Sequence, residues 1–456
     1  MTTLNRTDHG RPAAPVRILH LGIGNFTRAH QAWYTEHAHD AADWGIAAFT
    51  GRSPAIAETL APSEGLYQLC VADPDGDEVE VIGSLSAVHA ADDLAAWRGY
   101  FADPHLAIVT STITEAGYLR DKDGNLDLTH QQLAADLAAL QADPQAQVAT
   151  APAKFVAGLL ARRQAGGGKL TFCPCDNIPE NGPMIKRLVS QAAQRVDPAL
   201  VEWIEANVGV VTTMVDRITP RTTDEDRERV AAQTGVDDPA LVVTEPFSEW
   251  VLSGDFVAGR PAWEDAGARF VDDVVPHEAR KLTMLNGSHS LMAYAGPILG
   301  RETVCDAIND EVLLGWVNEF WDDAAKYYLT LPQAELDEYR EALLTRYRNP
   351  RIRHLLAQIA ADGSQKVAIR HVPTIKAALA RGEVATGATR AVAAWILHLL
   401  GMGAPVTDSQ ADELALLVTG DETSSAVAVL DRLGINEPRV LETVLSQMDE
   451  LRGRAA

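Results

Sequence analysis

The chain has 456 residues, of which 46% are hydrophobic and 22% are charged. This is an ordinary globular composition, which excludes disordered and fibrous proteins and leaves room for two or three domains of about 150 residues each. Lys and Arg total 39 against 63 Asp and Glu, so the formal net charge is −24, and we expect no binding to nucleic acid or to an anionic membrane surface, because both need a positive field.

The first part of the chain alternates strand and helix patterns. A short apolar and β-branched run begins at Val16, stops at glycines and passes into a helix-compatible stretch over residues 26–39. Further strands are expected at residues 45–50, 106–110, 170–175 and 208–215, with helices between them at residues 133–163 and 183–196. Strands that alternate with helices predict an α/β fold, with a doubly wound parallel sheet in a Rossmann-type, dinucleotide-binding domain over residues 1–275.

After about residue 275 the strand patterns fade and the apolar spacing becomes helical. The expected helices cover residues 278–294, 306–328, 334–346, 350–361, 374–381 and 389–400, with two more near the C-terminus. The sequence therefore predicts a second, mainly α-helical domain over residues 276–456, to which we assign substrate binding and catalysis.

Two glycines end the first expected strand and indicate a dinucleotide site. Gly22 and Gly24 would let the backbone turn sharply and approach a pyrophosphate, whose charge is stabilised by the N-terminus of the following helix. The third glycine of the motif G-x-G-x-x-G is missing, because Thr27 occupies its place. An ordinary strand-to-helix turn would also explain these glycines.

The residues after the second expected strand leave the choice of cofactor open. An acid at this position would bind the ribose 2′-hydroxyl in an NAD site, but the chain has Arg52 and Ser53 there. These two residues could hold a 2′-phosphate, or Arg52 could stack on adenine or be solvated. The residues themselves therefore leave the choice between NAD and NADP open.

Three polar residues share one side of the first helix expected in the second domain. At about 100° per residue, Lys281, Asn286 and His289 fall at about 0°, 140° and 80° around its axis. A lysine with a lowered pKa can remove the proton of an alcohol, an amide can donate to the alkoxide, and a histidine can hold the reacting oxygen. Gly287 costs the helix about 1 kcal/mol relative to alanine, which indicates a close approach to its backbone. A solvated lysine, a capping asparagine and a core histidine would fit the same spacing.

Polar side chains also follow two of the expected strands. Asp176 and Asn177 come after the apolar run that begins at residue 170, and Asp216 follows the strand at residues 208–215. The carboxyl edge of an open α/β sheet is where ligands bind, so both positions are candidate site residues. Each is also compatible with an ordinary turn or helix cap.

Five segments occur in a distinctive order along the chain. They are Gly-Ile-Gly-Asn-Phe-Thr-Arg-Ala-His-Gln at 22–31, Glu-Gly-Leu-Tyr at 64–67, Cys-Asp-Asn-Ile-Pro-Glu-Asn-Gly at 175–182, Met-Val-Asp-Arg-Ile-Thr-Pro at 214–220 and Lys-Leu-Thr-Met-Leu-Asn-Gly-Ser-His at 281–289. Together they resemble the long-chain mannitol dehydrogenase family of metal-independent polyol and sugar-acid dehydrogenases. The resemblance runs from about residue 16 to at least residue 373, and its most specific motif is the last, Lys-x4-Asn-x2-His.

The resemblance implies a catalytic role for each matching residue. Lys281 resembles the family's general base, which takes the hydroxyl proton as hydride leaves the same carbon for the nicotinamide. Asn177 and Asn286 resemble the pair that hydrogen-bonds the alkoxide. His289 resembles the residue that orients the reacting oxygen, and Asp216 resembles a polar group close to the substrate or the base.

The resemblance also bears on the cofactor turn and on metals. Gly22, Gly24, Asn25 and Phe26 match the family's cofactor turn. The family needs no zinc, and the four cysteines here include one Cys-x-Cys pair without the second pair of a zinc site. We therefore expect NAD as the cofactor, with NADP not excluded, and no metal.

The substrate is the feature that the sequence determines least. The family includes enzymes that oxidise mannitol or arabinitol, enzymes that reduce fructuronate or tagaturonate, and a phosphorylated mannitol branch. D-mannitol and D-fructose are the expected pair, because the Gly-Arg-Ser-Pro and Glu-Gly-Leu-Tyr segments look more like the polyol branch. A carboxylate or phosphate would need cations, for which the run at residues 346–354, Lys366 and Arg370 are candidates, although such runs are commonly solvated.

One alternative of a different class is a protein that binds the cofactor but has lost the chemistry. The intact set of Lys281, Asn286, His289 and Asn177 argues against it. The first 15 residues lack the apolar core of a signal peptide, and no apolar run reaches the roughly 18 residues that span a bilayer. We expect a cytoplasmic protein with a small-molecule polyol or ketose substrate and no membrane partner; the sequence leaves its oligomeric state open.

Overall fold

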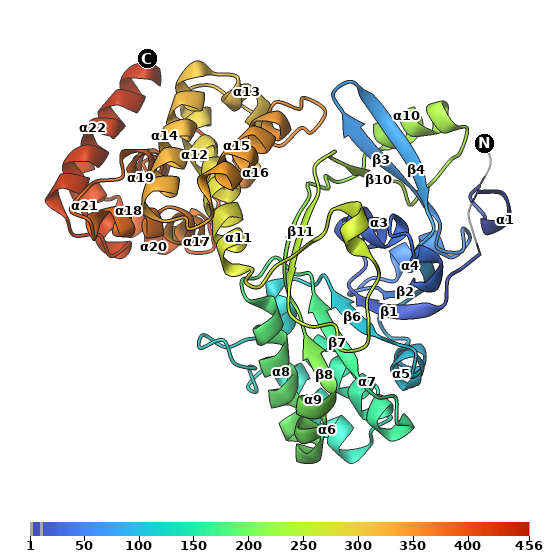
Figure 1. The fold of residues 1–456 in the computed structure, drawn as a ribbon. Helices are drawn as coiled ribbons and strands as arrows, with labels where there is room; N and C mark the ends of the chain where they lie inside the picture. The colour runs from blue at the N-terminus through green and yellow to red at the C-terminus, as the bar shows by residue number, and fades with distance from the viewer. Residues whose placement is uncertain (1–2, 10–11, 456) are drawn as a thin grey trace. The chain divides into compact units, whose positions relative to one another are not determined.

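The computed structural model describes residues 3–9 and 12–455 of the chain. Contacts within the chain divide it into two compact units, Met1–Val275 and Pro276–Ala456. The first unit contains the strands, and the second is built from helices (Figure 1).

A six-stranded parallel sheet forms the centre of the first unit. Its strand order is β5-β2-β1-β6-β7-β8. The strands are β1 (Val16–Leu21), β2 (Gly45–Phe49), β5 (Leu85–His89), β6 (Ile108–Ser111), β7 (Leu170–Pro174) and β8 (Val208–Val210). The order reverses beside β1, which pairs with β2 on one side and with β6 on the other. This is the strand order of a Rossmann fold, and it places a ligand crevice at the carboxyl ends of β1 and β6.

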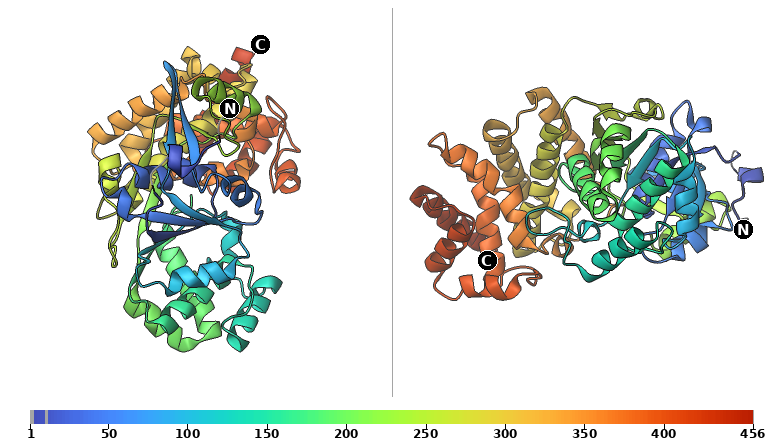
Figure 2. Two further views of the ribbon diagram at one scale, coloured as in Figure 1. Left: turned by 90° about the vertical axis from the view of Figure 1, so that its right-hand side faces the viewer. Right: turned by 90° about the horizontal axis from the view of Figure 1, so that it is seen from below.

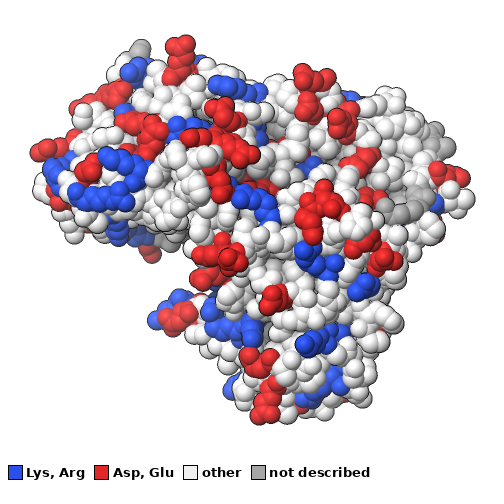
Figure 3. Space-filling model, viewed as in Figure 1, with Lys and Arg blue, Asp and Glu red and all other residues white. Residues whose placement is uncertain are grey.

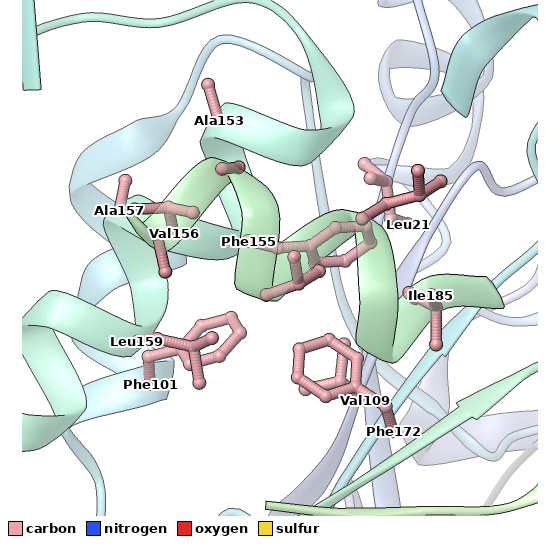
Figure 4. Close-up of a cluster of buried hydrophobic side chains, with 14 of the residues drawn as sticks. Leu21, Phe101, Val109, Ala153, Phe155, Val156, Ala157, Leu159, Phe172 and Ile185 are labelled. Carbon is pink, nitrogen blue, oxygen red and sulfur yellow. The ribbon is translucent and has the colours of Figure 1, made fainter. Parts of the chain in front are cut away.

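Alternate residues of these strands belong to two different cores, which explains why both faces of the sheet are covered. Leu19, Val109 and Phe172 pack on one side with five helices, of which Figure 4 shows part. These helices are α5 (Leu94–Ala102), α6 (Gln131–Ala142), α7 (Ala151–Ala165), α8 (Asn181–Val196) and α9 (Pro198–Asn207). Ile18 and Ile108 face the opposite side and pack with residues of the two small sheets. The predicted α/β fold with a doubly wound sheet is confirmed.

The opposite side of the large sheet carries short helices and two three-stranded sheets (Figure 2). The helices on this side are α2 (Asn25–Ala29), α3 (Gln31–Glu36) and α4 (Ala55–Leu60). One sheet contains β3 (Tyr67–Asp73), β4 (Gly76–Ile82) and β10 (Val242–Thr244), and the other contains β9 (Thr212–Asp216), β11 (Glu249–Ser253) and β12 (Arg269–Phe270). Helix α10 (Asp224–Thr234) contacts β4 through Arg229 and Asp77, and α1 (Arg6–His9) precedes β1. The β3–β4 hairpin, β5 and the strands after β9 were not predicted from the sequence.

Three predicted boundaries in the first unit are wrong. The helix expected at residues 133–163 is two helices, because Asp143 precedes Pro144 and a residue before proline avoids the α conformation; its φ of −145° and ψ of 111° are extended. The strand expected at residues 208–215 is split between β8 and β9, which belong to different sheets. The helix expected at residues 26–39 is interrupted at His30, where φ is −121° and ψ is −88°.

The second unit is built around one buried helix. Helix α12 (Asn286–Ile298) is buried continuously from Gly287 to Gly296 and contacts six of the other helices of this unit. The surrounding helices are α11 (Val275–Arg280), α13 (Val304–Ile308), α14 (Glu311–Tyr327), α15 (Gln333–Tyr347), α16 (Leu356–Ile359), α17 (Gly363–Arg370), α18 (Val372–Leu379), α19 (Thr386–Leu399), α20 (Ala411–Leu417), α21 (Glu422–Arg432) and α22 (Pro438–Ala455). The helix expected at residues 350–361 is confined to the four residues of α16, so that prediction is largely wrong.

The surface carries charges of both signs. Acidic and basic side chains are interspersed over the face drawn in Figure 3. Several of them pair at the surface, for example Lys326 with Glu383 at 2.6 Å and Arg340 with Asp322 at 2.6 Å. Within the described residues, we find no helix with both the length and the apolar character needed to cross a membrane.

Candidate active site

The turn after β1 requires glycine at its first position. Gly22 has a φ of +103°, and a Cβ atom built on it would lie 2.4 Å from the carbonyl oxygen of Thr112. The amides of Gly22 and Ile23 both donate to the carbonyl of Phe49, at 2.9 and 3.0 Å. The backbone therefore turns tightly against the loop after β6, as a pyrophosphate-binding turn must.

A buried polar network lies beneath this turn. His20 is fully buried on β1, with Nδ1 at 2.8 Å from Thr110 Oγ1 and Nε2 at 2.8 Å from Thr27 Oγ1. Thr27 Oγ1 lies 2.6 Å from Thr112 Oγ1, and the Thr112 hydroxyl donates to the carbonyl of Gly22 at 2.9 Å. Burial lowers the pKa of His20 to about 3, so the imidazole is neutral. Thr27, which replaces the third glycine of the motif, therefore helps to hold the turn.

A cavity of about 630 Å³ opens at this edge of the sheet. It is lined by Leu21, Gly22, Ile23, Gly51, Arg52, Thr112, Ile113, Thr114, Ala116, Gly117, Leu119, His130, Ala149, Thr150, Ala151 and Lys154. Of the predicted cofactor residues, Gly22 and Arg52 line it, and Gly24, Asn25 and Phe26 do not. The side chain of Asn25 instead accepts a hydrogen bond from Arg28 Nη2 at 2.8 Å and donates to the carbonyl of Pro220 at 3.4 Å. The volume is in the range of small-molecule and cofactor sites.

Asp176 connects the ends of β6 and β7. Its buried carboxylate accepts hydrogen bonds from the Ile113 amide at 2.6 Å, from the Ser111 hydroxyl at 2.7 Å and from the Tyr118 hydroxyl. Burial raises the pKa of Asp176, and these hydrogen bonds oppose the rise. The next residue, Asn177, is exposed at the carboxyl end of β7. Asp176 thus fixes both a cavity-lining loop and the backbone that presents Asn177.

Asp216 ends β9, at the position predicted from the sequence. Its side chain is buried, with 4% exposed, and it lies opposite Glu249 in the antiparallel pair of β9 and β11. The neighbouring Arg217 donates to the carbonyl of Ala29 at 2.5 Å and lies over the ring of Trp33 at 4.7 Å. Asp216 is therefore held on a rigid strand.

A π-helical turn, Lys281–Leu285, interrupts the helix that carries the predicted catalytic trio. Asn286 N–H donates to the carbonyl of Lys281, five residues earlier, as well as to that of Thr283. A π-turn has more residues per turn than an α-helix, so the separation of about 140° predicted between Lys281 and Asn286 is wrong. The two residues lie one turn apart, and the side chains of both are half-buried.

Side chains from other helices satisfy the carbonyls of this region. Trp321 Nε1 donates to Met284 O at 2.9 Å, and the Tyr347 hydroxyl donates to Leu285 O at 3.1 Å. Arg370 Nη1 donates to Asn286 O at 3.0 Å. Because a π-turn disturbs the regular bonding of the helix, these donors stabilise it at the point where Lys281 and Asn286 leave the backbone.

His289 lies in the buried interior next to the same turn, with 6% of its surface exposed. Its ring centroid is 4.9 Å from that of Tyr347 and 5.2 Å from that of His354. A Cβ atom on Gly287 would lie 2.7 Å from the ring of Phe320. The close approach predicted at Gly287 therefore exists, and its cause is side-chain packing.

Two predicted substrate cations occupy the region beside His289. Lys366 Nζ donates to the carbonyl of Ile359 at 3.0 Å, and Arg370 Nη1 donates to Ser290 Oγ at 2.9 Å as well as to the backbone of α12. Burial, and then the charge of Arg370, lowers the pKa of Lys366, which Asp362 and Asp408 oppose. Burial and the charge of Lys366 likewise lower the pKa of His354. Among the described residues, neither Lys366 nor Arg370 forms an ion pair with a carboxylate.

Several residues that shape these regions were not predicted from the sequence. Thr112 and Lys154 line the cavity, and Trp321 and Tyr347 support the π-turn. Tyr347 lies within the basic run at residues 346–354, where only the charges drew attention. The other three residues have no local signal, because their roles depend on contacts with distant segments.

Comparison with known proteins identifies the chain. The sequence model of the mannitol dehydrogenase Rossmann domain matches residues 16–265, and that of the mannitol dehydrogenase C-terminal domain matches residues 273–442. The chain belongs to the mannitol dehydrogenase family. The predicted family and the predicted enzyme class, an NAD(P)-dependent polyol dehydrogenase, are thereby confirmed, with NAD as the cofactor that the comparisons support.

Family members that are similar to this chain are named for different substrates. The chain is 38% identical to D-mannonate oxidoreductase of Escherichia coli K12 over 87% of this chain and 82% of that protein. It is 39% identical to D-arabinitol 4-dehydrogenase of Ralstonia nicotianae over 81% and 80%. The structure of Pseudomonas fluorescens mannitol 2-dehydrogenase in a ternary complex with NAD and D-mannitol matches with a TM-score of 0.80 and 34% identity, covering 99% of this chain and 96% of that one. The family is therefore certain, and the substrate within it is a separate question.

Proposed function

We propose that this mannitol dehydrogenase family member interconverts D-mannitol and D-fructose with NAD, and that Lys281 is the general base. The observation that carries the proposal is the π-turn, which brings Lys281 and Asn286 one turn apart on a buried helix, with His289 in the next turn. D-mannitol is chosen because the solved relative with 34% identity was crystallised with it. π-turns inside α-helices are frequently found at functional sites.

Each predicted site residue has a distinct role in the proposed reaction. In the oxidation direction, Lys281 Nζ takes the proton of the substrate hydroxyl, and the Asn286 amide donates a hydrogen bond to the oxygen as it becomes an alkoxide. His289 orients that oxygen, and we assign the second amide donor to Asn177 and a substrate contact to Asp216. NAD supplies the acceptor for the hydride that leaves the same carbon. The amide donors stabilise the developing charge that a metal would otherwise stabilise.

The first unit has features that fit a dinucleotide. The Gly22 turn leaves no room for a Cβ atom, and the cavity beside it is lined by residues that follow β1, β2 and β6. These positions form the switch point at which Rossmann folds bind their cofactor. The pyrophosphate would lie in the cavity beside the Gly22 turn, and Arg52 would lie near the ribose.

A panel of acceptors tests the substrate. We expect the purified protein to oxidise NADH with D-fructose, followed as loss of absorbance, and to be slower with D-fructuronate and with fructose 6-phosphate. Activity confined to fructuronate or to fructose 6-phosphate would contradict the choice of D-mannitol. Binding of NADH without turnover of any polyol, ketose or sugar acid would support a protein that has lost its chemistry.

A sugar acid, of the mannonate and fructuronate type, is the second candidate substrate. It is favoured by Lys366 and Arg370, two half-buried cations that lack a carboxylate partner among the described residues and would suit the carboxylate of the substrate. The E. coli D-mannonate oxidoreductase resembles the chain over most of its length. If this candidate is correct, Lys366→Gln lowers kcat/KM for fructuronate about 10-fold or more and leaves that for fructose nearly unchanged. An exposed lysine of α18, Lys376, provides the matched control.

A further inference from the structure

The end of β2 lacks the residue that favours NAD over NADP. In a Rossmann fold, an acid at this point hydrogen-bonds the ribose 2′-hydroxyl, whereas an arginine accommodates a 2′-phosphate. Here β2 ends at Phe49 and is followed by Thr50, Gly51 and Arg52. No acid therefore follows this strand to bind the ribose, and the Thr50 hydroxyl oxygen already accepts a hydrogen bond from the Ala91 amide at 2.8 Å.

The charges of the residues that line the cavity also favour a 2′-phosphate. Its lining includes Arg52, Lys154 and His130 but no aspartate or glutamate. Arg52 is exposed and forms no ion pair with any carboxylate in the described part of the chain. A Cβ atom on the adjacent Gly51 would have no heavy atom within 4 Å, so there is open space beside the arginine.

Lys154 adds a second positive charge close to the end of β2. Its ammonium donates to the carbonyl of Ala91 at 2.7 Å, and Ala91 is the residue whose amide binds Thr50. The lysine is almost completely buried, with 4% exposed, and its charge is partly balanced by the more distant Asp92 and Asp136. A cation held in this way lacks the flexibility of a surface lysine.

We propose that the adenosine end of this cavity accepts the 2′-phosphate of NADP(H), so that the enzyme binds both nicotinamide cofactors, and that Arg52 determines this property. The guanidinium of Arg52 forms a charge-assisted ion pair with the phosphate, and Lys154 contributes a supporting positive potential. The inference rests on the nicotinamide-dependent activity given above but is independent of the substrate.

Equilibrium titration without substrate tests the inference. The dissociation constants of NADPH and NADH are measured by cofactor fluorescence for the wild type, Arg52→Ala, Arg52→Glu and the control Arg195→Ala. Arg195 is exposed in the last turn of α8 and does not line the cavity. We expect wild-type NADPH to bind within about tenfold of NADH or more tightly. Arg52→Ala should weaken NADPH about 10- to 100-fold with little effect on NADH, and Arg52→Glu should weaken NADPH further.

Three results would overturn the inference. The first is a wild-type Kd for NADPH more than about tenfold above that for NADH. The second is equal weakening of both cofactors by Arg52→Ala, and the third is an equal effect of Arg195→Ala on NADPH. None of these three results contradicts the proposed reaction, provided that NADH still binds. Conversely, tight NADPH binding without turnover of any acceptor would contradict the proposed reaction and leave this inference standing.

Discussion

The two units hold their predicted functional residues by different means. In the first unit, the cofactor turn is formed by backbone geometry at the end of a parallel strand and is supported by the His20, Thr27 and Thr112 side chains, two of which lie within seven residues of one another. In the second unit, the π-turn under Lys281 is supported by side chains from other helices. The cofactor turn is therefore set in part by its own sequence, at Gly22, and in part by Thr112 from a distant segment, whereas the π-turn is supported by side chains of distant helices.

The largest expected effect is a loss of catalysis that leaves the binding of NADH unchanged. Lys281→Ala removes the general base, so kcat for fructose reduction and mannitol oxidation should fall about 10²- to 10⁴-fold. The Kd for NADH should not change, because the cavity-lining residues belong to the first unit. Steady-state kinetics and fluorescence titration measure the two quantities, and Lys376→Ala is the control. Retained turnover in Lys281→Ala would exclude Lys281 as the base.

The support of the π-turn gives the next largest effect. Tyr347→Phe removes the hydroxyl that donates to the Leu285 carbonyl and contacts Ser288 Oγ at 2.8 Å. The Leu285 carbonyl still accepts a hydrogen bond from Ser288 Oγ at 3.2 Å, so the variant loses one buried hydrogen bond and leaves no unsatisfied carbonyl. Such a loss costs up to about 1.5 kcal/mol, and we expect kcat to fall about tenfold at an unchanged Kd for NADH. Stopped-flow or steady-state assays at saturating cofactor measure this. If Tyr347→Phe lowers only the thermal stability and leaves kcat intact, the π-turn does not position the base.

These expectations reflect how much of the molecule was predictable. A glycine at the end of an apolar strand is a local signal, so the Gly22 turn and the parallel sheet followed from the sequence. The π-turn did not, because residues 281–289 have the same apolar spacing in an α-helix, and the donors Trp321, Tyr347 and Arg370 are 37, 62 and 84 residues from the carbonyls that they bind. The β3–β4 hairpin was not predicted, although its outer strand alternates charged and apolar residues as a half-buried strand does.

The threonine in the cofactor turn is expected to give a smaller effect that is confined to the first unit. Thr27→Val keeps the shape of the side chain but removes the hydroxyl that lies between His20 and Thr112. We expect the Kd for NADH to rise about tenfold, and kcat at saturating NADH to stay within about twofold of the wild type. Thr27→Ser retains the hydroxyl and should restore the affinity. An equal loss of affinity for NADH in the valine and serine variants would show that the packing of Thr27, and not its hydrogen bond, supports cofactor binding.

The smallest expected effect is a dependence of stability on pH that originates in the same network. Burial lowers the pKa of His20 to about 3 from the usual 6.5, so the folded chain keeps this imidazole neutral while the unfolded chain takes up a proton below pH 6.5. The stability that the neutral histidine contributes is therefore present above pH 6.5 and is lost progressively as the pH falls toward 3, by at most about 1.4 kcal/mol per pH unit.

His20→Gln tests this dependence, because glutamine can still hydrogen-bond the threonines but cannot be protonated. The Tm of the wild type should fall relative to that of His20→Gln between pH 6.5 and 5, by several degrees at about 2–4 °C per kcal/mol. Parallel Tm curves for the wild type and His20→Gln would mean that His20 is protonated in the folded state, and the orientation of Thr27 toward the Gly22 turn would then need another explanation.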